Sequence, residues 1–215
     1  MPDRPTITRP CIIVGNGGSV DEVPPEFWHQ YATYIGTNRC LVLAATQDVQ
    51  WTAIVMRDNY RTMWGEKNVG WQYHTIHWKP SPAYKVGASH DRSVHCDEYV
   101  KQTPQWQAEP TFTRDREMCV MKNASVVLMA INWAWLCGAR DIRLIGVDYR
   151  PPHHARMIEP WASGALHNIG HYDRPVPASI ERQFAEAVAG VEAGGGTLVN
   201  LSPGTKLRAV PCAAL

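Results

Sequence analysis

The sequence CIIVGNGGS, residues 11–19, joins a short apolar run to a glycine-rich turn. An apolar run without alternating polar residues is typical of a strand that is buried on both faces, as in a parallel sheet. The glycines end the strand abruptly, and Pro25 suits the first turn of a helix that follows. We therefore expect a strand, a tight turn and a helix, the opening unit of an α/β fold.

Helices and strands alternate again toward the C-terminus. Residues 124–136 are apolar nearly all round, which indicates a helix packed on more than one face. A short link leads to the apolar run 142–147, and a helix followed by a strand is the repeating unit of a parallel sheet. The other expected elements are strands at 35–38, 49–56 and 197–201 and an amphipathic helix at 179–192. The predicted fold class is α/β, a single Rossmann-like, mostly parallel sheet flanked by helices.

Two segments have no sustained periodicity. Residues 64–118 hold many Trp, Pro and Gly residues and are expected to form strands and long loops. Residues 151–177 carry several histidines on a polar background and are expected to form a lid-like insertion. Because 215 residues fit one domain, we expect residues 1–215 to form a single domain that includes this lid.

The overall charge argues against a nucleic acid or membrane partner. Lys and Arg number 21 against 20 Asp and Glu, so no global field attracts polyanions. No apolar stretch reaches the about 20 residues that a membrane-spanning helix needs, and the polar, proline-broken N-terminus is unlike a signal peptide. The 6 cysteines lack the spacings of a disulfide scaffold. These features predict a cytoplasmic protein without a transmembrane segment, whose thiols are reduced and mostly buried.

Polar residues occur where the expected strands end. In an open parallel sheet the ligand lies at the carboxyl ends of the strands, and Asn38, Asp58 and Asp148 join the turn 16–19 there. Glycines in the turn would let backbone N–H groups approach a phosphate, although an ordinary strand-to-helix turn has the same composition. Asn16 offers an acceptor and a donor, and it suits a turn equally well. Asp148 could bind a ribose hydroxyl or Mg²⁺, or simply end a strand.

Six strings occur in the same order as blocks of a known family. They are IIVGNGGSV, IGTNRC, VMRDNY, GARDIRLIGVDYR, NIGHYD and NLSPGTKL, and together they touch roughly half of the chain. In these strings the chain resembles the bacterial sialyltransferases of glycosyltransferase family 42. The broader relatives of that family include the sialyltransferase-like domains of flagellin-modifying proteins and the MptE-like 6-hydroxymethylpterin diphosphokinases.

The resemblance implies a nucleotide- and donor-binding site assembled from several blocks. Its expected members are Asn16, Gly17, Gly18, Ser19, Asn38, Asp58, Ser125, Gly146 and Asp148. The first asparagines match residues that contact the nucleotide and its phosphate, and the Gly146 block matches the one beside the ribose. Gly18 and Asp58 differ from the Pro and Asn that are usual in the family.

The resemblance also implies a catalytic set. His171, which follows Gly170, matches the general base of the family, and histidine suits that role because its unperturbed pKa is about 6.5. Arg150 and Arg156 stand where tyrosine hydroxyls hold the single phosphate of the donor. Since arginine is a permanent bidentate cation, these two residues favour a more highly charged donor than CMP-sialic acid. The other histidines lack a matching set of Cys or acidic ligands, so we expect no metal site of protein ligands alone.

Three functions stay open. The first is a glycosyltransferase that moves a sugar, sialic-acid-like or other, from a nucleotide-activated donor to the hydroxyl of a small-molecule or glycan acceptor, with no required cofactor. The second is an MptE-like diphosphokinase, which would need Mg²⁺ through Asp148 or Asp58. The third is an inactive nucleotide-binding accessory protein. The sequence leaves the donor base, the acceptor and the formation of a homo-oligomer open.

Overall fold

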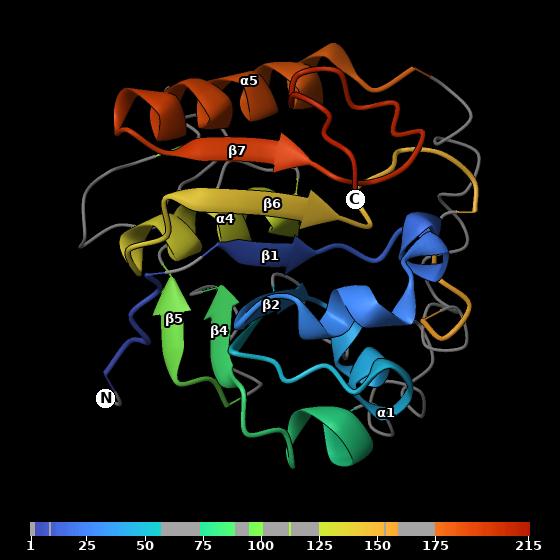
Figure 1. The fold of residues 1–215 in the computed structure, drawn as a ribbon. Helices are drawn as coiled ribbons and strands as arrows, with labels where there is room; N and C mark the ends of the chain where they lie inside the picture. The colour runs from blue at the N-terminus through green and yellow to red at the C-terminus, as the bar shows by residue number, and fades with distance from the viewer. Residues whose placement is uncertain are drawn as a thin grey trace.

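A computed structural model of the chain describes residues 3–8, 10–56, 74–88, 95–100, 112, 125–152, 154–158 and 175–215. Its centre is a seven-stranded sheet in the order β5-β4-β3-β2-β1-β6-β7, in which every neighbouring pair is parallel (Figure 1). The strands are β1 Cys11–Val14, β2 Thr33–Thr37, β3 Ala53–Met56, β4 Tyr84–Ala88, β5 Glu98–Val100, β6 Asp141–Ile145 and β7 Thr197–Asn200. The prediction of a Rossmann-like parallel sheet is confirmed.

Short helices and two long ones connect the strands. The long helices are α4, Val126–Leu136, and α5, Ala178–Ala193, and α1, Ala44–Gln47, is a single turn. The others are the 3-10 helices η1 Gly18–Glu22, η2 Pro25–His29 and η3 Cys40–Leu43 and the π-helix η4 His74–Trp78. The part of the chain that the structure describes contains no helix long and apolar enough to cross a membrane.

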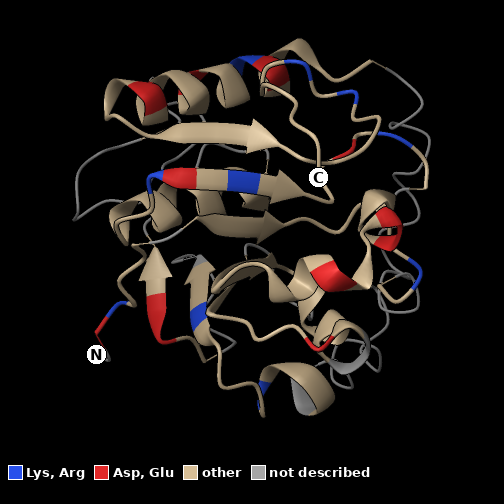
Figure 2. Ribbon diagram, in the orientation of Figure 1, with Lys and Arg blue, Asp and Glu red and all other residues tan. Residues whose placement is uncertain are grey.

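Both faces of the sheet are covered, which explains the unbroken apolar run of β1. Cys11 and Ile13 belong to a core cluster shared with α4 and α5, whereas Ile12 and Val14 belong to a second cluster shared with η1, η2 and η3. All four side chains of β1 are fully buried. Figure 2 shows acidic and basic residues interspersed over the described ribbon, in keeping with the absence of a strong net charge.

Several predicted boundaries needed correction. The helix expected near Pro25 is the five-residue 3-10 helix η2, because only residues 30–32 separate it from β2. Asn38, expected at the end of a strand, lies just outside β2 with a φ of 48°. Most of the expected lid at 151–177, including His171, lies outside the described residues, and so does Asp58.

The five cysteines in the described part of the chain form no disulfide with one another. Cys11, Cys40, Cys96 and Cys137 are buried, and Cys212 is exposed. Burial raises the pKa of the Cys11 and Cys40 thiols to about 12. These two thiols are therefore protonated and unreactive at neutral pH.

A buried carboxylate fastens the edge strand β5 to α4 and to the N-terminal segment. Glu98 accepts hydrogen bonds from Nε of Arg4 at 2.9 Å and from Nε1 of Trp133 at 3.0 Å. Arg4 also forms an ion pair with the second oxygen of Glu98, and this hydrogen bonding raises the pKa of the guanidinium. The Trp133 ring stacks on Tyr84 of β4. Glu98 thus links residues far apart in the chain at one point.

We expect Trp133→Phe to lower the free energy of unfolding by about 1.5–3 kcal/mol more than Trp28→Phe, since it removes a hydrogen bond to a charged group. Trp28 is a matched control because it is equally buried and its Nε1 has no hydrogen-bond partner in the described structure. Both substitutions remove a similar ring volume. Urea denaturation of the two variants measures the difference, and equal losses of stability would contradict the prediction.

Candidate functional site

The order in which strands are added to the sheet reverses at β1, so a topological switch point lies between β1 and β6. Strands β2 to β5 lie on one side of β1, and β6 and β7 lie on the other. Val14 of β1 pairs in register with Gly36 of β2 and with Ile145 of β6. In such a sheet the connection after β1 and the connection after β6 lie on opposite faces. This leaves a crevice at the carboxyl ends of the two strands, where ligands of open α/β sheets bind.

Asn16 joins the carboxyl ends of β1 and β2. Its side-chain oxygen accepts a hydrogen bond from the backbone N–H of Arg39 (3.2 Å), and its side-chain amide donates to Oγ1 of Thr37 (3.4 Å). Thr37 donates to the carbonyl of Val14 at 2.9 Å, which ties the ends of the two strands together. Asn16 is half-buried, so part of it stays accessible at this edge of the sheet.

Asn38 lies at the same edge. It precedes the residue that Asn16 binds, is half-buried, and adopts a left-handed conformation with a φ of 48°. Asparagine tolerates this conformation better than most residues. Its backbone N–H donates to the carbonyl of Val55 in β3 at 2.9 Å. The two asparagines predicted from separate strands are therefore brought together.

The glycines of the turn allow two loops to pack closely. A Cβ on Gly15 would lie 2.3 Å from the carbonyl oxygen of Gly146, and a Cβ on Gly17 would lie 2.5 Å from a carboxylate oxygen of Asp148. A Cβ on Gly18 would lie 2.4 Å from Cγ of Pro152. Real side chains do not tolerate such distances, so these positions need glycine for protein packing alone.

The backbone N–H groups of the turn are mostly occupied, which differs from the expected phosphate cradle. The donors and their acceptors are Gly15 with Ile145 O, Gly17 with Gly146 O, Gly18 with Pro152 O, and Ser19 with the Asp148 carboxylate. The N–H of Asn16 donates to no described residue. Within this turn, a ligand could therefore accept a hydrogen bond from the Asn16 N–H without breaking an existing bond.

Asp148 braces the turn. One carboxylate oxygen accepts from the backbone N–H of Ser19 at 2.7 Å, and the other accepts from the Ser19 hydroxyl. Asp148 is only 3% exposed and Ser19 is fully buried. Burial raises the pKa of Asp148, while the hydrogen bonds from Ser19 oppose the rise. Both oxygens are therefore committed to the protein, and neither is presented to a ribose or to Mg²⁺ as the sequence had suggested.

A C-terminal loop holds Asp148 and its neighbour Val147 in place. Ser202 accepts a hydrogen bond from the backbone N–H of Val147 at 2.9 Å, and Asn200 and Thr205 donate to the carbonyl of Val147 at 3.1 and 2.8 Å. These three residues were not predicted from the sequence as part of the site. The signal in the sequence that could have indicated them was their place in the string NLSPGTKL.

The two predicted arginines have different surroundings. The Arg150 guanidinium pairs with Glu22 of η1 and donates to the carbonyl of Pro203 at 3.1 and 2.8 Å. Arg156 is exposed, and its backbone N–H donates to Asp21 at 2.8 Å. Arg150 thus fastens η1 to the C-terminal loop, while the Arg156 side chain faces solvent.

Ser125 caps the N-terminus of α4, where its hydroxyl accepts a hydrogen bond from the backbone N–H of Val127 at 3.2 Å. The last turn of α4 lies against Ile7, just before β1, because the N–H of Ile7 donates to the carbonyl of Cys137 at 2.8 Å. The helix therefore runs antiparallel to β1, and its N-terminus points toward the carboxyl edge of the sheet. A helix N-terminus favours negative charge.

Arg39 and Cys40 are further residues of this edge that the sequence analysis did not single out. Arg39 is 3% exposed, and a buried cation at a ligand edge favours anions. The Cys40 thiol donates to the carbonyls of Val14 and Gly15 at 3.1 and 3.3 Å, so it supports the backbone from which the turn begins. Both follow directly on Asn38 in the string IGTNRC.

The described part of the chain contains no group of three or more His, Cys, Asp and Glu side chains placed to hold a metal ion. His171 and Asp58 lie outside the described residues, so their predicted roles stay predictions. The members that the structure places at the carboxyl edge are Asn16, Gly17, Gly18, Ser19, Asn38, Ser125, Gly146 and Asp148.

No protein-family model, curated protein or solved structure matches the chain.

Proposed function

We propose that the carboxyl edge of β1, β2 and β6 binds a nucleotide-activated sugar and that the chain transfers this sugar to an acceptor hydroxyl. The supporting observation is the convergence of Asn16 and Asn38, half-buried at neighbouring strand ends, beside the switch point. Open parallel sheets bind phosphorylated ligands at such points.

The donor would be held mainly by amides and helix ends. The Asn16 N–H, the Asn38 side chain and the N-terminus of α4 at Ser125 supply donors that suit a phosphate. Buried Arg39 adds positive charge at the same edge. In this proposal Asp148 and the glycines shape the site without contacting the ligand, because their polar groups are committed to the protein.

The transfer step would use His171 as the general base that removes the proton from the acceptor hydroxyl. Arg156 would stabilise the negative charge of the departing phosphate, which is catalysis by electrostatic stabilisation of the transition state. Arg150 would contribute less, since Glu22 already neutralises it. A His171→Ala variant that folds and keeps full turnover would remove His171 from this mechanism.

Nucleotide binding is tested with two matched glycine variants. Asn38→Gly keeps the left-handed backbone and removes only the side chain, and Asp48→Gly does the same at an exposed position with a φ of 52°. We expect Asn38→Gly to raise the Kd for CMP, UDP or ADP about tenfold, the value of one hydrogen bond. Asp48→Gly should leave the Kd unchanged. Calorimetric titration measures both.

Two results would end the proposal: binding of none of these nucleotides, or equal effects of the two variants. If a nucleotide binds, turnover of a panel of nucleotides and nucleotide sugars with and without EDTA separates the reactions. A glycosyltransferase should release the nucleotide from its sugar donor in the presence of EDTA, whereas a diphosphokinase should require Mg²⁺. Binding without any turnover would instead indicate an accessory protein.

A further inference from the structure

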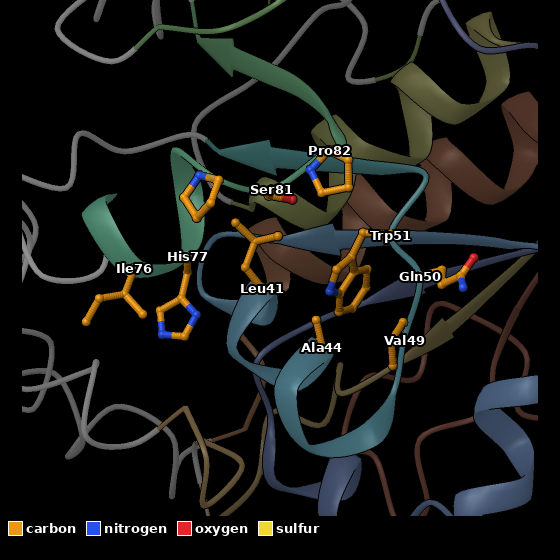
Figure 3. A pocket seen from close by; sticks show the side chains of 10 residues that line it. Leu41, Ala44, Val49, Gln50, Trp51, Ile76, His77, Ser81 and Pro82 are labelled. Atoms are coloured by element: carbon orange, nitrogen blue, oxygen red, sulfur yellow. The ribbon is translucent and has the colours of Figure 1, made fainter.

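A cavity of about 540 Å³ lies between η3, α1, η4 and the segments that lead into β3 and β4. Its lining comes from residues between 41 and 51, from 76–77 in η4 and from 80–82 (Figure 3). Trp51 and Pro82 each stand two residues before a strand, β3 and β4 respectively, so this part of the cavity wall lies at the amino ends of these strands. Its volume is within the range of small-molecule sites, about 300–1,000 Å³.

The described lining is mostly apolar, with Gln50, His77 and Ser81 as its polar members, and it contains no ionised side chain. The buried part of the wall is formed by Leu41, Val49 and the Trp51 ring. Exposed parts come from Pro80, Pro82 and Ile76, and Ile76 is 57% exposed. None of the described lining residues is Asp, Glu, Lys or Arg. Burial lowers the pKa of His77, so the imidazole is neutral at pH 7. A charged ligand would therefore lose its hydration without gaining a counter-charge from these residues.

The Trp51 indole carries an unused hydrogen-bond donor. The residue is 8% exposed, and Nε1 is buried without a partner in the described structure. A Cβ on Gly36 would lie 3.0 Å from Cζ3 of the indole, so the benzene edge packs on β2 and the Nε1 edge faces away from it. Burying an N–H without an acceptor is unfavourable, and an acceptor on a ligand would recover part of that loss.

We propose that this cavity binds a small, uncharged molecule that contains a planar ring and a carbonyl oxygen. The ring packs against the Trp51 indole and the prolines, and the carbonyl accepts the hydrogen bond from Nε1. Since Nε1 is buried, the side chains around the indole move slightly to admit the carbonyl. The site is separate from the proposed nucleotide site and does not depend on that proposal.

The test uses benzamide and two comparison probes. Toluene lacks the amide group, and benzoate carries a negative charge. In a ¹⁵N-labelled sample the Trp51 indole N–H signal is identified by its loss in Trp51→Phe. We expect benzamide to shift this signal with a Kd in the millimolar range, as its size allows. Toluene and benzoate should bind about tenfold more weakly or not at all.

Two alanine variants provide the spatial control. Ala44 lines the cavity and is exposed, so Ala44→Leu should fill part of it and raise the Kd of benzamide at least about tenfold without loss of folding. Ala178→Leu makes the same change at an exposed position of α5 and should leave the Kd unchanged. The proposal is overturned if benzamide leaves the Trp51 signal in place, if benzoate binds equally well, or if Ala44→Leu binds benzamide like the unaltered protein.

Discussion

Gly146→Ala is expected to lower the free energy of unfolding by about 3–5 kcal/mol, through a strained backbone and a steric clash together. Gly146 follows β6 with a φ of 72°, where an L side chain is strained. The new Cβ would lie 2.6 Å from the carbonyl oxygen of Gly15 and 2.7 Å from Cγ2 of Val20. Because the first of these atoms belongs to the backbone, the turn after β1 would have to move.

Gly195→Ala separates the two causes. Gly195 has nearly the same φ, 77°, but a Cβ there would meet no atom within 4 Å. We expect this control to cost about 1 kcal/mol, the backbone strain alone. Urea denaturation of both variants gives the difference. Equal losses would show that close packing between the two turns does not require glycine at position 146.

The sheet could be predicted from the sequence because its apolar strands are recognisable from local sequence patterns. The run CIIV has no polar residue, and the structure explains this by burying alternate side chains in two different clusters. The helix at 124–136 and the helix at 179–192 were predicted within a few residues of α4 and α5, since their apolar patterns are long. Short elements such as η2 were harder to predict, because the number of residues left before β2 decides their type.

The site was only partly predictable, because its main contacts join residues far apart in the chain. The glycines of the turn suggested an open phosphate cradle, but their close partners, Gly146, Asp148 and Pro152, lie more than 120 residues away. The same holds for the ion pair of Arg150 with Glu22. No local pattern reveals such pairings. The convergence of Asn16 and Asn38 was predictable, since it needs only the rule that parallel strands end at one edge.

The brace between Asp148 and Ser19 yields a prediction that distinguishes support from ligand binding. Asp148→Ala should cost about 3 kcal/mol, because it leaves the buried N–H and hydroxyl of Ser19 without their acceptors and opens a cavity. Asp148→Asn should cost much less. Its amide oxygen can accept from the Ser19 N–H, and its NH₂ group can donate to the Ser19 hydroxyl oxygen.

The pH dependence of stability follows from the raised pKa of Asp148. Between the ordinary value of 3.8 and the higher pKa of the folded state, the folded protein holds a proton that the unfolded chain has released. The stability of the unaltered protein relative to Asp148→Asn should therefore be greatest below this window. It should fall as the pH rises through the window and stay constant above the folded-state pKa. Urea denaturation across this pH range measures the change, and a relative stability that rises with pH would contradict it.

The nucleotide affinity of Asp148→Asn also distinguishes a supporting role of the carboxylate from ligand binding. If the carboxylate only positions the turn, Asp148→Asn should keep the Kd for a nucleotide within about threefold, since the geometry of Ser19 and Asn16 is preserved. If the carboxylate instead binds a ribose hydroxyl or a Mg²⁺ ion, the same variant should lose at least about tenfold in affinity. The hydrogen bonds of both oxygens to Ser19 and the 3% exposure of Asp148 favour the first result. A carboxylate that a ligand cannot reach acts through the turn that it holds.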